Sequence, residues 1–261
     1  LAPRAGMQAE VPALDRVQLL GMMDMGMAHD MGMAHDMGGQ GPAGHDMGGM
    51  PGSGPAGGAD HAGMNHAAMP GMDHAGMHGS GANQGGMVEV RHPYPAERGV
   101  GNSMLPDVVS TRLDDPGVGL RDNGRRVLTY ADLHSMREPD DNRPPSREIE
   151  LHLTGNMERY MWSFNGVKFS DAKPIVLRYG ERVRFVLVND TMMTHPIHLH
   201  GLWSDLESPD GAFQVRKHTI TLNPAQRLSY RVSADARGHW AYHCHLLYHM
   251  EAGMFRAVVV E

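Results

Sequence analysis

The sequence lacks several features that commonly indicate where a protein works and what it binds. Its single cysteine, Cys244, cannot form a disulfide within the chain, so cysteine usage gives no sign of an oxidising compartment. No apolar run approaches the length of a membrane span, and we expect a soluble chain. The formal net charge is -7 and basic residues form no cluster, which argues against nucleic acid or anionic lipid as a partner and favours cations.

Aromatic residues are also missing from the first part of the chain. The first is Tyr94, so a packed core is plausible only in the later part, about one domain's worth of sequence. Before it, only residues 17–20 form an apolar stretch that predicts a single strand. The chain begins with Leu1 and shows no signal-peptide pattern, so we expect a fragment or a processed product.

Residues 21–87 form a tract of low complexity that is rich in Met, His and Gly. The unit DMGMAH occurs at residues 24–29 and again at 30–35, and the stretch 22–87 holds fourteen of the 23 methionines and seven of the 18 histidines. Such a composition buries too little apolar surface to offset the entropy of ordering, so we expect a disordered segment. Thioethers prefer Cu(I), and His and Asp extend the range to Cu(II), which suggests a copper-collecting arm. An inert linker that happens to be Met-rich is the alternative.

The pattern changes after a connecting segment, residues 88–145, which holds a strand-like stretch at 126–130 and a helical turn at 131–136. From residue 147 apolar and polar residues alternate, as in strands. Short strands without a long helix predict an all-β fold for residues 146–261, an antiparallel Greek-key β-sandwich. The expected strands are 149–153, 160–164, 175–179, 183–187, 197–203, 217–222, 227–232, 240–245 and 255–260.

Metal-binding side chains gather in two short clusters. The first runs from 243 to 254 and contains Cys244, His249 and Met254, three of the four ligands of a two-His, one-Cys copper site with a weak axial Met. The second is HPIHLHG at residues 195–201, in which His195 is the candidate for the fourth ligand. Zinc also binds His and Cys, but one cysteine, one axial-type methionine and seven histidines fit it poorly.

Strand alternation allows these clusters to serve two metal centres. Side chains of successive strand residues point to opposite faces, so Cys244 faces one way and His243 and His245 face the other. The same alternation places His198 and His200 together, with His195 displaced toward Cys244 by the bend that Pro196 imposes. We expect the isolated histidines to be structural: His134, His152, His218 and His239.

The motifs HPxHxHG and HCHxxxHxxxxM resemble the C-terminal copper signatures of the multicopper oxidases. Residues 147–155, residues 189–194 and the Met-rich tract extend the resemblance to the periplasmic copper-resistance oxidases of the CopA type. It implies a cupredoxin-like domain at 146–261, with residues 1–20 as the tail of a preceding cupredoxin domain. Position by position, it makes His195, Cys244, His249 and Met254 type 1 copper ligands, His198 a type 2 ligand, and His200, His243 and His245 type 3 ligands.

The resemblance further implies periplasmic location and electron transfer from a type 1 copper, through His243, Cys244 and His245, to a trinuclear cluster that reduces dioxygen to water. A complete cluster also needs HxHG and HxH motifs from an N-terminal cupredoxin domain, and this chain has no His-x-His pair besides those at residues 198–200 and 243–245. We therefore expect copper ions, dioxygen and the missing domains as partners, and little oxidase activity from this chain alone.

The reducing substrate and the protein's class stay open at this point. Met192, Met193 and Met250, with the carboxylates Asp190, Asp205 and Glu207, could form an entry site for Cu(I), or the methionines could simply pack the core. Phenolic donors are the alternative substrate. A non-enzymatic copper-binding protein for sequestration is the alternative class.

Overall fold

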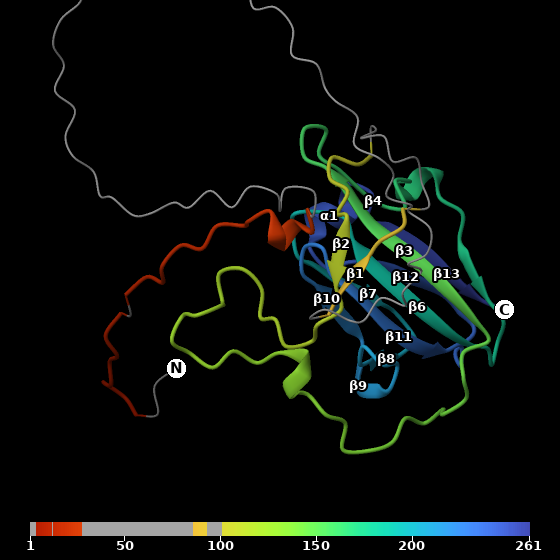
Figure 1. Cartoon of the computed structure of the whole chain (residues 1–261). Coiled ribbons are helices and arrows are strands. Elements are labelled where there is room, and N and C mark those ends of the chain that lie inside the picture. Colours follow the sequence, from red (N-terminus) through yellow and green to blue (C-terminus); the bar gives the residue numbers. More distant parts are fainter. Residues whose placement is uncertain (1–3, 12, 28–85, 93–100) are drawn as a thin grey trace, which may run out of the picture. The chain divides into compact units, whose positions relative to one another are not determined.

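The computed structural model of the chain describes residues 4–11, 13–27, 86–92 and 101–261 (Figure 1). Within these residues the structure is almost entirely β, and no helix there is long and apolar enough to cross a membrane. The predicted Met/His-rich tract lies largely outside the described residues.

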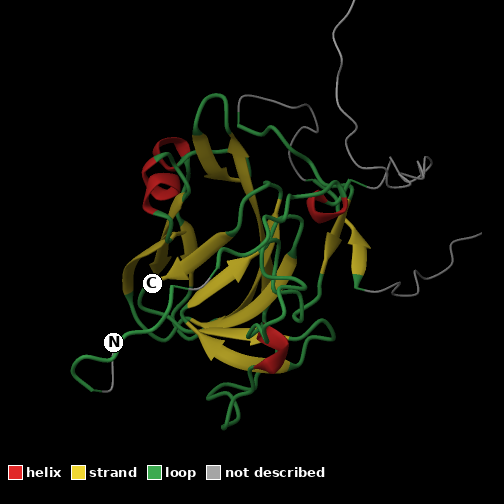
Figure 2. Cartoon of the chain, turned by 90° about the vertical axis from the view of Figure 1, so that its left-hand side faces the viewer, coloured by secondary structure: helices red, strands yellow, loops and turns green. Residues whose placement is uncertain are grey.

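Most strands belong to two larger sheets (Figures 1 and 2). The first has, in spatial order, β4 (Met161–Phe164), β3 (Arg147–Asn156), β6 (Arg182–Asn189), β11 (Arg227–Ser233), β8 (Ser204–Glu207) and β9 (Phe213–Lys217). The second has β10 (Thr219–Leu222), β7 (His195–Leu199), β12 (Gly238–Cys244), β13 (Phe255–Val260) and β5 (Ile175–Leu177). The only α-helix among the described residues, α1, spans Leu247–Glu251, and three 3-10 helices span Met23–Met25, Tyr130–Asp132 and Phe169–Asp171.

The two sheets pack face to face over one hydrophobic core, which confirms the expected all-β, cupredoxin-like sandwich. Burial alternates along β11 and β13, so each strand gives every second side chain to the core. Tyr242 of one sheet stacks on Phe164 of the other at 5.5 Å between ring centroids and lies 5.6 Å from Phe185. These contacts join the inner faces directly.

The prediction of a purely antiparallel sandwich is wrong at two strand pairs. β3 runs parallel to β6, and β5 runs parallel to β13. Parallel neighbours need a long connection, and the chain between β3 and β6 provides one that includes β4, a 3-10 helix and β5.

Two predicted strands do not form. In the 126–130 stretch the side chain of Asp132 accepts a hydrogen bond from the Thr129 N–H (2.9 Å), which starts a 3-10 turn instead of extended pairing. Residues 17–20 pair with no strand in the described part of the chain, and Leu19 is exposed. The Gln18 side chain accepts a hydrogen bond from the Gly119 N–H (3.0 Å), which connects this segment to the rest of the chain.

The predicted strand 197–203 ends early because the chain turns at Gly201. This residue has φ +69°, and a Cβ there would lie 2.2 Å from the Trp240 ring, so only glycine fits. The following residues form β8, which pairs with β9, and neither strand was predicted as such.

A small two-stranded sheet covers the outer side of β6. It consists of β1 (Met87–Glu89) and β2 (Val108–Ser110). Val88 and Val90 pack there against Val186 and Val188 of β6. This places the segment that follows the Met-rich tract on the sandwich.

Candidate metal centres

The loop after β12 gathers three of the predicted ligands. Cys244 ends β12, His249 lies in α1, and Met254 precedes β13. The Cys244 N–H donates to the Met254 carbonyl (3.1 Å), and the Met254 N–H donates to the His249 carbonyl (2.9 Å). These hydrogen bonds close the loop, and all three side chains are buried.

His195 joins this group from the neighbouring strand. β7 pairs with β12 so that Ile197 lies opposite Cys244, and His195 lies on the inner face. Its Nδ1 is 3.6 Å from the Cys244 Sγ and 3.1 Å from the His249 Nδ1, which is itself 3.8 Å from Sγ. One thiol and two imidazole nitrogens therefore converge in the core.

A hydroxyl behind His195 selects its tautomer. The Thr191 hydroxyl donates to the Asn189 Oδ1 (2.8 Å), so the same oxygen accepts the Nε2–H of His195 at 2.7 Å. The Nδ1 lone pair of His195 then points toward Cys244. Burial, followed by the neighbouring His249, lowers the pKa of His195 to about 3, so the ring is neutral at pH 7.

Burial shifts the pKa values of the other two donors in opposite directions. It lowers the pKa of His249, which keeps that imidazole neutral, and it raises the pKa of the Cys244 thiol to about 11. The metal-free group therefore carries no formal charge at pH 7. Trp162 of β4 covers it, stacked on His249 at 4.0 Å and edge-on to His195 at 5.1 Å between ring centroids.

Four further histidines cluster on the other face of the same two strands and just beyond their ends. His198 lies opposite His243 in the β7–β12 ladder, and the rings of His200 and His245 lie beside them. The Nδ1–H of His243 donates to the Cys244 carbonyl (2.9 Å), and that of His198 donates to the His218 carbonyl. Both rings therefore present Nε2, and the Nε2 of His243 lies 3.0 Å from that of His200.

This four-histidine cluster opens to the protein surface, unlike the Cys244 group. His200 and His245 are exposed, His198 is partly exposed, and only His243 is buried. Burial, followed by the neighbouring imidazoles, lowers the pKa of His200. The ring is therefore available as a neutral ligand at pH 7.

The structure corrects two of the sequence-based expectations about the site. His195 reaches Cys244 without a bend at Pro196, because β7 is a regular strand and residues 195 and 198 alternate onto opposite faces. Asp205 and Glu207 are not part of an entry site beside Met192. They lie in β8 and are buried in ion pairs, Asp205 with Arg182 at 2.8 Å and Glu207 with Arg184 at 2.7 Å.

Sequence analysis missed two residues that contact the Cys244 group, Thr191 and Trp162. Thr191 precedes His195 by four residues, a spacing that carries no known signature of its own. Trp162 stands in a predicted strand, but its contact with His249 depends on how the two sheets meet.

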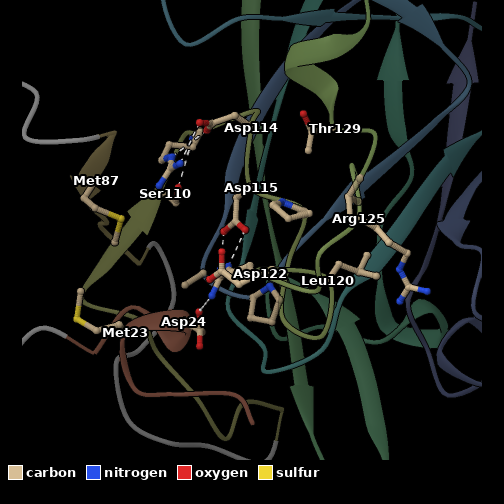
Figure 3. Close-up of a pocket in the computed structure, with 16 residues that line it drawn as sticks. Met23, Asp24, Met87, Ser110, Asp114, Asp115, Leu120, Asp122, Arg125 and Thr129 are labelled. Carbon is tan, nitrogen blue, oxygen red and sulfur yellow. Dashed lines mark hydrogen bonds and ion pairs between the residues drawn. The ribbon is translucent and has the colours of Figure 1, made fainter. Parts of the chain in front are cut away.

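A cavity of about 600 Å³ lies apart from both histidine groups. Met23 and Met87 line it, together with Asp24 and Asp115 (Figure 3). Arg121 forms ion pairs with both of these carboxylates. The cavity therefore lies where the two described segments that flank residues 28–85 meet the domain.

The chemistry of the donor set fits copper. A thiol sulfur and two imidazole nitrogens, each offering one atom within 4.8 Å of the others, are all buried. A soft thiolate with borderline imidazoles is the combination that copper selects among the first-row metals. An all-β sandwich with this donor set in its core places the chain in the class of cupredoxin-like copper proteins.

Comparison with known proteins narrows this class. Residues 142–261 match the multicopper oxidase family. The chain is 59% identical over 277 residues to a copper resistance protein A homolog from Pseudomonas syringae pv. tomato and 55% identical over 276 residues to copper resistance protein A from Escherichia coli. Both matches cover 100% of this chain. Residues 142–261 therefore form a multicopper oxidase domain, and the whole chain is similar to copper resistance protein A.

The chain spans only part of these relatives, 41% of the first and 43% of the second. Among solved structures, a multicopper oxidase from Campylobacter jejuni aligns with 48% of this chain and 32% of its own, with 20% identity and a TM-score of 0.40.

Proposed function

We propose that the chain is the C-terminal part of a multicopper oxidase that acts in copper resistance. The observation that carries this proposal is the tripeptide at the end of β12, because Cys244 faces the buried group while His243 and His245 face the four-histidine cluster. Two donor sets are thus joined by covalent bonds within three residues. In this proposal residues 146–261 form the cupredoxin domain, 88–145 a connecting segment, 21–87 a copper-binding tract, and 1–20 the tail of a preceding domain.

In this proposal each predicted ligand keeps the role that the motifs suggested. His195, Cys244 and His249, with Met254 as a weak axial ligand, hold a type 1 copper. The four-histidine cluster supplies half of a trinuclear site: His198 for type 2 copper, and His200, His243 and His245 for type 3 copper. Bound copper supplies one-electron redox chemistry and, at the trinuclear site, the reduction of dioxygen to water.

The chain's own groups prepare the type 1 site. Cys244 must lose its thiol proton to serve as a ligand, whereas the two imidazoles are already neutral. Thr191 holds the His195 ring in its ligating tautomer, and Trp162 excludes water from the His249 side. The site is therefore largely preorganised before copper enters.

The exposed position of His200 and His245 supports a cluster completed by another domain. Four imidazoles cannot saturate three copper ions, and affinity depends on ligand number. The partial coverage of the relatives supports the same idea, since it leaves room for N-terminal cupredoxin domains outside this chain.

For the substrate we favour Cu(I), with phenolic donors as the second candidate. The names of the two relatives, which refer to copper resistance, support a metal substrate. The periplasmic location rests on the resemblance of the motifs to the CopA type. Met193 packs against the core beside the site and Met192 is exposed, so a thioether route to His195 is available. A non-enzymatic sequestration protein is the alternative class.

The test is the absorption spectrum of the copper-loaded chain. Cys244 is the sole thiol, so Cu(II) held at the buried group should give an intense blue thiolate-to-copper charge-transfer band. The variant Cys244→Ser should lose the band while keeping the fold, and His239→Gln, at an exposed histidine outside both groups, should keep it. A folded wild-type chain that binds copper but stays colourless would contradict the proposal.

A further inference from the structure

A third group of metal-binding side chains lies on the outer side of the six-stranded sheet. His92 follows β1, His152 lies in β3 between the core residues Leu151 and Leu153, and Asp190 follows β6 directly. One donor atom from each of the three lies within 4.8 Å of the other two. Sequence analysis had assigned His152 a structural role.

The three side chains meet at one carboxylate oxygen. The His152 Nδ1 is 2.7 Å and the His92 Nδ1 is 3.0 Å from the same atom, Asp190 Oδ2. The side chains of His152 and Asp190 are fully buried, and that of His92 is 12% exposed. This is a built arrangement within the fold rather than a surface coincidence.

The far nitrogen of each ring also faces an oxygen. The Nε2–H of His92 donates to the Pro106 carbonyl (2.9 Å), which can only accept. The Nε2 of His152 lies 3.2 Å from the Glu150 Oε1. Histidines that bind metals usually donate their second N–H to a backbone carbonyl or a carboxylate, and both kinds of partner occur here.

A cation can stand between the three groups. With Nε2 protonated, a neutral imidazole directs its Nδ1 lone pair at Asp190, and two lone pairs facing a carboxylate repel one another. A proton on each Nδ1 or one metal ion relieves this. Burial lowers the pKa of His92, but the hydrogen bond and the charge of Asp190 outweigh it and raise the pKa overall.

The distances suit a metal ion as well as a proton. An ion about 2.0–2.2 Å from each donor holds neighbouring donor atoms roughly 2.8–3.5 Å apart. The His92 Nδ1–Asp190 Oδ2 distance of 3.0 Å falls within this range, and the His152 Nδ1–Asp190 Oδ2 distance of 2.7 Å lies just below it. The Nδ1 atoms of His195 and His249 in the Cys244 group lie 3.1 Å apart.

We propose that His92, His152 and Asp190 form a separate binding site for a divalent transition-metal ion. Two imidazoles and a carboxylate, without sulfur, select Cu(II) over Cu(I), and Cu(II) over Zn(II) where both are present. Because His92 follows β1, the ion ties the segment after the Met-rich tract to β3 and β6. The site shares no ligand with the Cys244 group, so a test of this site is independent of the proposed oxidase function.

The first experiment uses Zn(II), which is diamagnetic, as the probe on the full chain labelled with ¹⁵N-histidine. Metal binding moves an Nδ1 resonance away from the positions of both the protonated and the free nitrogen. The resonances of His92 and His152, assigned by comparison with His92→Gln and His152→Gln, should move together with one equivalent of zinc. In His92→Gln the His152 response should be lost, and in the control His239→Gln both responses should remain.

The second experiment counts Cu(II) by equilibrium dialysis in a Cys244→Ser background, so that type 1 copper does not contribute. His92→Gln should bind one copper ion fewer per chain than His239→Gln. The variant Glu150→Gln, which keeps the three ligands and changes the partner of His152, should weaken this one site by about 10–100-fold. If His92 and His152 keep their protons on Nδ1 in excess zinc while the chain stays folded, the group is a proton-bridged clamp and the proposal is wrong.

Discussion

The indole of Trp162 lies stacked on the imidazole of His249, with their ring centroids 4.0 Å apart and their planes inclined by 24°. Trp162 itself is 1% exposed, so it separates the imidazole from solvent. The neighbouring strand leaves room for the ring, because Gly155 lies opposite Trp162 and a Cβ there would come within 2.4 Å of the indole. The rigidity of the ligand His249 therefore depends on a residue outside both copper motifs.

We expect the variant Trp162→Leu to make His249 more mobile and more accessible to water. Replacing a buried tryptophan by a smaller side chain should lower the free energy of unfolding by about 2–4 kcal/mol. Water reaching His249 should broaden and weaken the blue absorption band of the copper-loaded chain. Denaturant unfolding and absorption spectroscopy measure the two effects.

Trp203→Leu is the matched control, because Trp203 is half exposed and lies edge-on to His218 instead of the Cys244 group. It should change neither quantity appreciably. An unchanged blue band in a folded Trp162→Leu variant would show that Trp162 contributes to packing alone.

Thr191→Val tests the tautomer of His195. Valine has nearly the same shape but no hydroxyl, so the buried Nε2–H of His195 loses its acceptor at 2.7 Å. Leaving a buried donor unsatisfied should cost about 1–3 kcal/mol of stability. The loss of this partner should also weaken copper binding at the Cys244 group by about 10–100-fold.

Thr194→Val, at an exposed threonine whose hydroxyl faces Asn223, provides the comparison. Copper titration followed at the blue band measures both variants. Equal affinities for Thr191→Val and Thr194→Val would mean that the Thr191 hydroxyl does not orient His195.

Copper binding at the Cys244 group should release one proton at pH 7. The pKa of the buried Cys244 thiol is raised to about 11, so the free protein holds this proton until copper displaces it. The pKa of His195 is lowered to about 3 and that of His249 is also lowered, so neither ring has a proton to lose. Affinity should therefore rise about tenfold per pH unit over the neutral range.

Calorimetry in buffers of different ionisation enthalpy gives the number of protons released. Copper also binds elsewhere in the chain, so the quantity of interest is the difference between the wild type and Cys244→Ser. A difference near one proton is expected. Two or more would mean that an imidazole is protonated in the free protein.

The sequence predicted the parts of this architecture that depend on local pattern. Strand alternation alone separates Cys244 from His243 and His245, and the structure has the same division of faces. The sandwich follows from the repeated alternation of buried and exposed residues after Arg147. The parallel pairing of β3 with β6 depends on long connections, which periodicity does not reveal.

Contacts between distant segments could not be predicted in this way. His92 and Asp190 are 98 residues apart, and neither belongs to the two copper motifs, so nothing in the sequence connects them. Asp205 and Glu207 appeared to be available carboxylates because their arginine partners stand in β6, about 23 residues earlier. Only the fold decides which charged groups are already paired.

The final prediction is that this chain alone consumes dioxygen slowly, although its Cys244 site should accept electrons. His198, His200, His243 and His245 supply fewer imidazoles than three copper ions require, and two of these rings are exposed. An underligated cluster loses metal or fills with water. Oxygen uptake with a one-electron donor should therefore be slow for this chain and fast for a full-length relative that contains additional N-terminal HxHG and HxH motifs.

The internal control for this comparison is the loss of the blue band when the same donor reduces the copper at the Cys244 site. It should proceed in the isolated chain, which separates a working electron-accepting site from an incomplete site for dioxygen. The variant Cys244→Ser should show no blue band to lose, and His239→Gln should lose its band as the wild type does. Rapid four-electron turnover by the isolated chain would require ligands from a second copy, because this sequence contains no further His-x-His pair, and turnover that rises steeply with protein concentration would identify that case.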